Sequence, residues 1–164
     1  MTNGKKSRTQ LTHLDSQGNP RMVDIQQKGV TDREALAEGW VLINDSTIEA
    51  IDTQQIKKGD VLKVAQLAGI MGSKNCSQLI PLCHPIPIDG VTMNLEVVPK
   101  KGIHISALVK TRWKTGVEME ALTAVTASAL TVYDMVKAID KEACITNVQL
   151  LHKTGGKSGN WFKK

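Results

Sequence analysis

The sequence predicts an α+β protein of the ferredoxin-like type, in which helices pack on one face of an antiparallel sheet. Segments with strand and helix character follow one another in the order strand, helix, strand, strand, helix, strand, the βαββαβ pattern. The 164 residues, 41% hydrophobic and 23% charged, suit one domain with a proper core. We therefore expect a single domain over residues 11–159, with a flexible tail at 1–10 and a second tail at 160–164.

Four segments have the composition of strands. The first is the short apolar run Trp40–Ile43. Val91–Val98 alternates well enough for a second strand, and the turn at Pro99–Gly102 joins it to a hairpin partner, Ile103–Trp113. Ala143–Leu151 is expected to be the last strand.

Two helices complete the pattern. Asp60 is a plausible N-cap for the first, and Gly72 is its natural stop. The second and longest is expected over residues 116–139, with Thr115 and Glu118 spaced as a capping box. Each helix has an apolar stripe: Val61, Val64, Ala65, Ala68 and Met71 in the first, and Leu122, Val125, Ala129, Val132, Val136 and Ile139 in the second.

A second face of the long helix carries Asp134 and Lys137 beside apolar residues that solvate a charge poorly. Such a carboxylate and amine can exchange protons with a substrate, but an exposed ion pair three positions apart is the alternative. Lys58 lies just before the first helix, where the helix dipole disfavours a cation. It is either an acid–base group in a cleft or a solvated lysine.

Three further segments are candidates for binding. The proline-rich stretch Ile80–Pro87 is stiff, and either presents residues 82–84 to a ligand or is an inert connector. The glycine-rich segment 153–159 lacks the first glycine of a P-loop, yet Lys153 and Lys157 could hold phosphates there, a flexible tail being the alternative. Arg33 is an anion ligand or an ordinary surface residue.

Charge and cysteine content narrow the function classes. The net charge of +5 and pI of about 9.2 favour phosphate-bearing partners, either nucleic acid or a small nucleotide. The three cysteines include no C-x-x-C pair and the four histidines are scattered, so we expect reduced thiols, a cytoplasmic location and no metal site. No secretory signal and no apolar run of membrane-spanning length are visible.

Two non-enzymatic hypotheses are weaker. A nucleic-acid-binding sheet needs aromatic residues on its central strands, and the one Phe and one Tyr lie elsewhere. A purely structural oligomer does not explain so many candidate Lys, Glu, Asp and His residues. A non-catalytic nucleotide- or nucleic-acid-binding module is kept as the alternative to an enzyme.

Five motifs of the sequence carry a resemblance to a known family. The motifs are Lys58-Gly-Asp-Val61, Leu82-Cys-His-Pro85, Lys114-Thr-Gly-Val-Glu-Met-Glu-Ala-Leu-Thr123, Tyr133-Asp-Met135 with Lys137, and Lys153–Gly159. Together they resemble the molybdenum cofactor biosynthesis protein C family, the cyclic pyranopterin monophosphate synthases. The resemblance spans residues 11–159, and the stretch Lys114–Thr123 is its most specific part.

The resemblance implies a lyase reaction. Its substrate is the 3′,8-cyclised dihydro form of GTP, and its products are cyclic pyranopterin monophosphate and pyrophosphate. Asp134 is implied as the main acid–base group, assisted by Lys137 and Lys58. The implied substrate-binding residues are Leu82, Cys83, His84, Met119 and Glu120, with Glu118, Arg33 and Lys153 nearby. No obligatory cofactor is implied, although magnesium could accompany the triphosphate, and neither nucleic acid nor a membrane is an expected partner.

The spacing of two carboxylates predicts a shared site. Glu120 and Asp134 are fourteen positions apart, about 21 Å along one helix, with no Pro or Gly between them. That is too far for both to reach one reacting centre within one chain. We therefore expect an oligomer whose pocket takes one end of the helix from each of two chains; the resemblance implies a hexamer built as a trimer of dimers.

Overall fold

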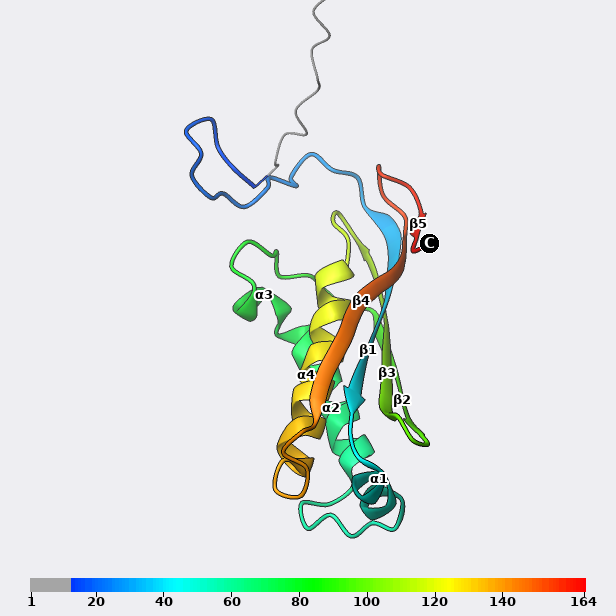
Figure 1. The fold of residues 1–164 in the computed structure, drawn as a ribbon. Helices are drawn as coiled ribbons and strands as arrows, with labels where there is room; N and C mark the ends of the chain where they lie inside the picture. The colour runs from blue at the N-terminus through cyan, green and yellow to red at the C-terminus, as the bar shows by residue number, and fades with distance from the viewer. Residues whose placement is uncertain (1–12) are drawn as a thin grey trace, which may run out of the picture.

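The computed structural model describes residues 13–164, and the tail expected at 1–10 lies outside the described residues. Helices α2 and α4 pack on one face of a five-stranded sheet of order β2-β3-β1-β4-β5 (Figure 1), which confirms the ferredoxin-like prediction. The elements are β1 Thr31–Leu42, α1 Asp45–Asp52, α2 Val61–Lys74, α3 Cys76–Leu79, β2 Gly90–Val98, β3 Gly102–Trp113, α4 Glu118–Val136, β4 Cys144–Thr154 and β5 Trp161–Phe162.

Strand β1 is three times as long as the short run that the sequence predicted, because its core-facing residues are small. Ala35 and Ala37 are fully buried, and they lack the bulk that usually identifies a strand. Gly39 faces the same core, where a Cβ would lie 2.7 Å from Cγ1 of Val125 on α4. These small residues let α4 approach the sheet closely. The central strands β1 and β3 pair antiparallel along their whole length.

Helix α2 packs along α4 through glycine. A Cβ on Gly72 would lie 2.6 Å from the Cβ of Ala127, so a glycine is needed for this close approach. Gly72 was expected to end the helix, but α2 continues to Lys74 and the prediction of a stop is wrong. Asp60 is the N-cap, as predicted, and accepts a hydrogen bond from the Lys63 N–H.

Helix α4 is shorter than predicted at both ends. Its N-cap is Val117, without a side-chain hydrogen bond, so the expected capping box is wrong. The Glu118 carboxylate instead contacts Lys153 of β4 at 2.8 Å. Val125, Ala129, Val132 and Val136 of the predicted stripe are fully buried, whereas Ile139 lies beyond the helix and is 55% exposed. A long-range ion pair thus replaces the local cap.

Three elements were not expected. The short helix α3 follows α2 directly. Helix α1 begins at an Asn44 cap, and the buried Asp140 accepts a hydrogen bond from the Asn44 N–H at 2.8 Å. Strand β5 pairs with β4 through residues 161 and 162, so the sheet extends beyond the boundary at residue 159. Within residues 13–164, no helix is both long and apolar enough to cross a membrane.

Candidate active site

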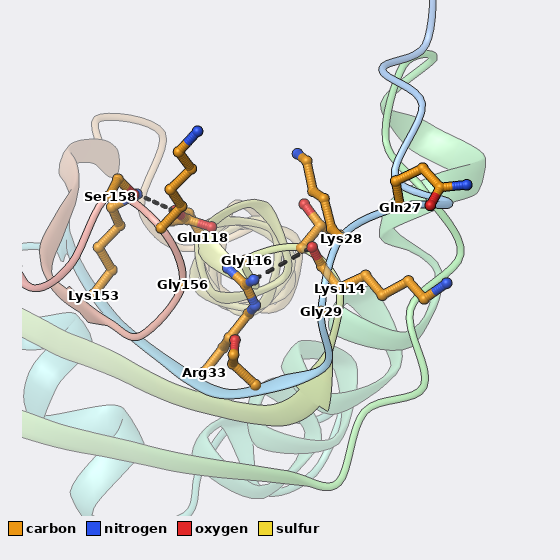
Figure 2. A pocket seen from close by; sticks show the side chains of 13 residues that line it. Gln27, Lys28, Gly29, Arg33, Lys114, Gly116, Glu118, Lys153, Gly156 and Ser158 are labelled. Atoms are coloured by element: carbon orange, nitrogen blue, oxygen red, sulfur yellow. Dashed lines mark hydrogen bonds and ion pairs between the residues drawn. The ribbon is translucent and has the colours of Figure 1, made fainter.

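A cavity of about 820 Å³ opens at the N-terminal end of α4, and Figure 2 looks into it almost along that helix. Its charged side chains are five cations and one carboxylate: Lys28, Arg33, Lys114, Lys153, Lys157 and Glu118. The unpaired backbone N–H groups at a helix N-terminus add a partial positive charge to the same place. This concentration of positive charge is suited to an anion with several phosphate groups.

Arg33 is held in position from both sides. Its Nε donates to the Trp113 carbonyl at 3.0 Å, and its Nη2 donates to the Lys114 carbonyl at 3.3 Å. The loop after β4 packs directly against the guanidinium. A Cβ on Gly156 would therefore collide with Nη1 of Arg33. Gly156 also has φ of +75°, a conformation in which other residues are strained. The geometry therefore orders this arginine before a ligand arrives.

Lys153 links the glycine-rich loop to α4. Its Nζ contacts Glu118 Oε1 at 2.8 Å and Ser158 Oγ at 3.3 Å, and both members of the ion pair are about 70% buried, with side-chain exposures of 28% and 29%. The segment 153–159 is therefore anchored at its first residue. Because Glu118 neutralises Lys153, a phosphate entering the cavity competes with that carboxylate for the lysine.

A second cavity, of about 360 Å³, adjoins the first and shares Lys28, Thr115, Gly116 and Glu118 with it. It is lined by five of the residues predicted to bind substrate: Leu82, Cys83, His84, Met119 and Glu120. The structure therefore brings all eight predicted binding residues to one end of α4. The proline-rich stretch is irregular and extended, and the His84 ring is placed by a 2.8 Å hydrogen bond between Nε2 and the Val23 carbonyl.

Burial dominates the electrostatics of this second cavity. Glu120 is only 3% exposed, and desolvation raises the pKa of its carboxyl above the ordinary value. Desolvation, together with the neighbouring Glu120 charge, also raises the pKa of the Cys83 thiol. At the cavity wall, therefore, a carboxyl with increased affinity for protons lies beside a thiol that resists ionisation.

Lys58, Asp134 and Lys137 form a separate cluster at the C-terminal end of α4. The Lys58 Nζ lies 2.8 Å from Asp134 Oδ2 and 2.6 Å from the Asp134 carbonyl, and the Lys137 Nζ lies 2.7 Å from Oδ1. Hydrogen bonds from Lys137 and then Lys58 lower the pKa of Asp134 to about 2. The same contact raises the pKa of Lys137.

The prediction that Asp134 is poorly solvated is wrong for the single chain. Its side chain is 56% exposed, and its pKa moves down because of the two ammonium groups. Helix α4 runs unbroken from 118 to 136, so about 21 Å separates Asp134 from Glu120 along the axis. The structure therefore divides the predicted site residues into two groups at opposite ends of one helix.

Three titratable side chains that line the cavities were not proposed as site residues from the sequence: His13, Lys28 and Lys114. Lys114 opens the most specific motif, so its position in that motif could have identified it. Lys28 and His13 belong to the segment before β1, which has little regular structure and therefore no periodicity from which to place them. Their position depends on how that segment folds back over the start of α4.

Comparison with known proteins identifies the family. The family model described as "MoaC family" matches residues 22–156, which include all the predicted site residues at both ends of α4. The chain belongs to the MoaC family. Several of its relatives are named cyclic pyranopterin monophosphate synthase. The protein from Desulfitobacterium hafniense is 53% identical over 155 residues, covering 94% of this chain and 95% of the relative.

Two other relatives of the same name show the same breadth of similarity. The one from Streptomyces avermitilis is 51% identical over 162 residues, covering 99% of this chain and 95% of its own. The one from Dinoroseobacter shibae is 55% identical over 154 residues, covering 92% of this chain and 96% of its own. Because the similarity extends over nearly the whole of each chain, it includes the residues at both ends of α4.

Proposed function

We propose that the protein is a cyclic pyranopterin monophosphate synthase, a lyase of molybdenum cofactor biosynthesis. Its substrate is the 3′,8-cyclised 7,8-dihydro form of GTP, and it releases cyclic pyranopterin monophosphate and pyrophosphate. The observation that carries the proposal is the similarity to synthases of that name over 94% of the chain. The two adjoining cavities provide an independent chemical argument. The larger one is strongly cationic and suits the charged phosphates of a nucleotide, whereas the second is less charged and suits the heterocycle.

The triphosphate fits the larger cavity. Its negative charge would meet Arg33, Lys153 and the N-terminus of α4, and its approach would draw Lys153 away from Glu118. The heterocycle then extends into the second cavity, between the proline-rich segment and Glu120. There Cys83 and His84 offer hydrogen-bonding groups on a stiff backbone, which loses little entropy when the substrate binds.

We assign the acid–base work to Asp134, assisted by Lys137 and Lys58. With a pKa of about 2, the Asp134 carboxyl is ionised at neutral pH, so it begins the reaction as a proton acceptor. Lys137, with its raised pKa, begins as a cation that can neutralise phosphate. One step needs such charge neutralisation. A ribose hydroxyl attacks the α-phosphorus and gives its proton to the Asp134 carboxylate, while the bond to pyrophosphate breaks and the pyrophosphate leaves with the bonding electrons.

The separation of the two clusters supports a site shared between subunits. The 21 Å between Asp134 and Glu120 cannot be closed within one unbroken helix. Two chains whose α4 helices run antiparallel would bring the Asp134 end of one beside the Glu120 end of the other. We propose a homo-oligomer with such pockets, a hexamer arranged as a trimer of dimers, located in the cytoplasm.

The proposal includes no obligatory cofactor and no nucleic-acid partner. Among residues 13–164, no group of three or more His, Cys, Asp and Glu side chains is arranged to hold a metal ion. Magnesium is proposed only as an ion that enters bound to the triphosphate.

The activity assay tests the proposal directly. The pure protein, incubated with the cyclised dihydro-GTP, should release pyrophosphate and yield a product that oxidises to a fluorescent pterin. GTP itself serves as the control and should yield neither. If the folded protein binds the cyclised nucleotide but releases no pyrophosphate, the chain is the non-catalytic nucleotide-binding module, and the enzyme assignment is rejected.

A further inference from the structure

The last residues of the chain close the glycine-rich segment into a hairpin loop. Strand β5 pairs antiparallel with β4, and Phe162 lies opposite His152. Beyond this pair, the Lys163 N–H donates a hydrogen bond to the Leu151 carbonyl at 2.7 Å. Residues 155–160, called the C-terminal loop below, are therefore held at both ends, by β4 before them and by β5 after them (Figure 1).

A hydrogen bond across the C-terminal loop fixes its shape. The Gly155 N–H donates to Oδ1 of Asn160 at 3.1 Å, and the Gly159 N–H donates to the Gly156 carbonyl, also at 3.1 Å. All three glycines have a positive φ, between +68° and +84°, which other residues rarely adopt. Because glycine backbone is conformationally free, a loop with three such residues needs fixed contacts to keep one shape. Asn160 supplies one of these contacts from its side chain.

The C-terminal loop forms one wall of the larger cavity. Gly156, Lys157 and Ser158 line this cavity, and Figure 2 shows Gly156 and Ser158 beside the cations described above. The Ser158 hydroxyl accepts a hydrogen bond from the Lys153 Nζ at 3.3 Å, and Gly156 packs against Arg33. A change in the shape of the loop therefore moves three lining residues relative to two cations of the cavity.

An aromatic stack holds β5 against β4. The ring of Phe162 is nearly parallel to that of His152, with an interplanar angle of 2° and a distance of 5.5 Å between the centroids. The His152 side chain is 18% exposed, whereas Phe162 is 61% exposed. A strand of two residues forms few backbone hydrogen bonds and is marginal without side-chain contacts. The stack supplies such a contact at the point where the loop ends.

Asn160 and Phe162 line neither cavity. Both follow residue 156, where the match to the family model ends. Within one chain, they therefore act on the cavity through the C-terminal loop and not by contact with a ligand.

We propose that Asn160 and Phe162 are positioning residues for the larger cavity. Phe162 holds β5 beside β4 by stacking on His152, and Asn160 closes the loop so that residues 156–158 meet the triphosphate in a fixed arrangement. A loop that is ordered in advance loses less conformational entropy when the anion binds. The inference rests on the proposed function for the identity of the substrate, but the shape of the loop can be measured without any activity.

Hydrogen exchange in the full-length protein measures the closure of the loop. The Gly155 amide should exchange roughly fivefold faster in Asn160→Ala, a ratio typical of one lost hydrogen bond. Asn160→Asp keeps an acceptor oxygen and should retain the slow exchange. Asn94→Ala is the matched control, because Asn94 is an exposed asparagine of β2 outside both cavities, and it should leave the loop unchanged.

The affinity for inorganic tripolyphosphate measures the consequence for the cavity. Calorimetric titration should show the Kd raised roughly fivefold in Asn160→Ala and in Phe162→Ala, because each releases one contact that orders the loop. Phe162→Tyr keeps the stacked ring and should bind as the unchanged protein does. With the cyclised nucleotide, Asn160→Ala should raise KM to a similar extent and leave kcat within about twofold, since the Asp134 end of α4 is unaffected.

Each outcome supports or rejects the inference. Unchanged exchange at Gly155 in Asn160→Ala would overturn the closure of the loop by that side chain, and unchanged affinity for tripolyphosphate in both alanine variants would overturn the positioning role. Equal losses in Phe162→Ala and Phe162→Tyr would overturn the role of the stack. If one alanine variant does not fold, the other decides by the same criterion.

The unchanged protein separates this inference from the proposed function. If it does not bind tripolyphosphate, the positioning role is rejected. If it binds tripolyphosphate and the variants behave as expected, but it has no synthase activity, the proposed function fails while the positioning of the loop stands.

Discussion

The two ends of α4 carry carboxyl groups in opposite physical states. At the N-terminal end Glu120 is 3% exposed, faces a cavity, and has a pKa raised by desolvation. At the C-terminal end the side chain of Asp134 is 56% exposed, contacts two ammonium groups, and has a pKa lowered to about 2. Two acidic residues on one helix therefore differ in proton affinity because one is removed from water and the other is paired with cations.

This difference indicates a division of labour. A buried carboxyl with raised pKa suits hydrogen bonding to an uncharged heterocycle, whereas an ionised one beside two lysines suits proton transfer coupled to charge neutralisation. Neither end has both properties. A pocket that combines them needs one end of α4 from each of two chains, so the contrast between the ends is itself an argument for the oligomer.

The largest expected effect is on turnover. Asp134→Asn and Lys137→Ala should each lower kcat by at least about a hundredfold, the usual scale for a positioned acid–base group. Steady-state kinetics measure this, and Asp32→Asn is the control because that carboxylate is 91% exposed and 3.8 Å from its partner Arg112. Near-normal turnover in both variants would mean that the Asp134 cluster is only a surface ion pair.

Two variants, one at each end of α4, test whether the two ends meet. Asp134→Asn mixed with Glu120→Gln under subunit exchange should recover activity, because about a quarter of the pockets in randomly exchanged two-fold pairs receive two intact ends. Each variant incubated alone is the control. No recovery, despite exchange demonstrated by mass spectrometry, would reject a pocket built from the two ends of α4 of different chains.

A smaller effect is expected on substrate binding at the N-terminal end. Lys153→Ala removes a phosphate contact and leaves Glu118 without its cation, so KM should rise by the equivalent of roughly 1.5–3 kcal/mol. Lys110→Ala is the matched control. The Lys110 Nζ also forms an ion pair with a glutamate, 2.9 Å from Glu34 Oε2, but this pair lies outside both cavities. An unchanged KM would contradict the proposal that the triphosphate binds in the larger cavity.

The smallest effect is on stability, and its sign should differ between the two ends. The folded pKa of Asp134 lies below the ordinary value of 3.8, so its contribution is present above that pH and is lost as pH falls toward about 2. The folded pKa of Glu120 lies above the ordinary 4.5, so the folded state binds more protons and stability falls as pH rises through that window.

Chemical unfolding at several pH values checks this contrast. Asp134→Asn should flatten the acid-side loss of stability, and Glu120→Gln should remove a loss that appears at higher pH. The unchanged protein and Asp32→Asn provide the reference curves. If both variants change the pH dependence in the same direction, the two carboxyls share one environment and the comparison is wrong.

Much of the fold follows from local pattern. The order of the four long strands and of helices α2 and α4, the hairpin after Val98, the Asp60 cap and most of the buried stripe of α4 were predicted, because each depends on residues close in sequence. The predictions failed where a residue distant in sequence determines the local structure. The Thr115–Glu118 spacing indicates a capping box, but the Glu118 carboxylate forms an ion pair with Lys153 instead. Gly72 indicates the end of a helix, but a glycine is needed there because a side chain would collide with Ala127 of α4.

The candidate site divides in the same way. The sequence by itself determined which residue types carry the chemistry, that Glu120 and Asp134 lie about 21 Å apart on one helix, and through its motifs the family. Only the tertiary structure decided the protonation tendencies of those carboxyls, because these depend on burial and on cations brought from elsewhere in the chain. It also decided that Arg33, Lys28 and Lys153 meet at the start of α4. Helical spacing is a property of the local backbone, whereas desolvation and ion pairing arise only when the chain folds back on itself.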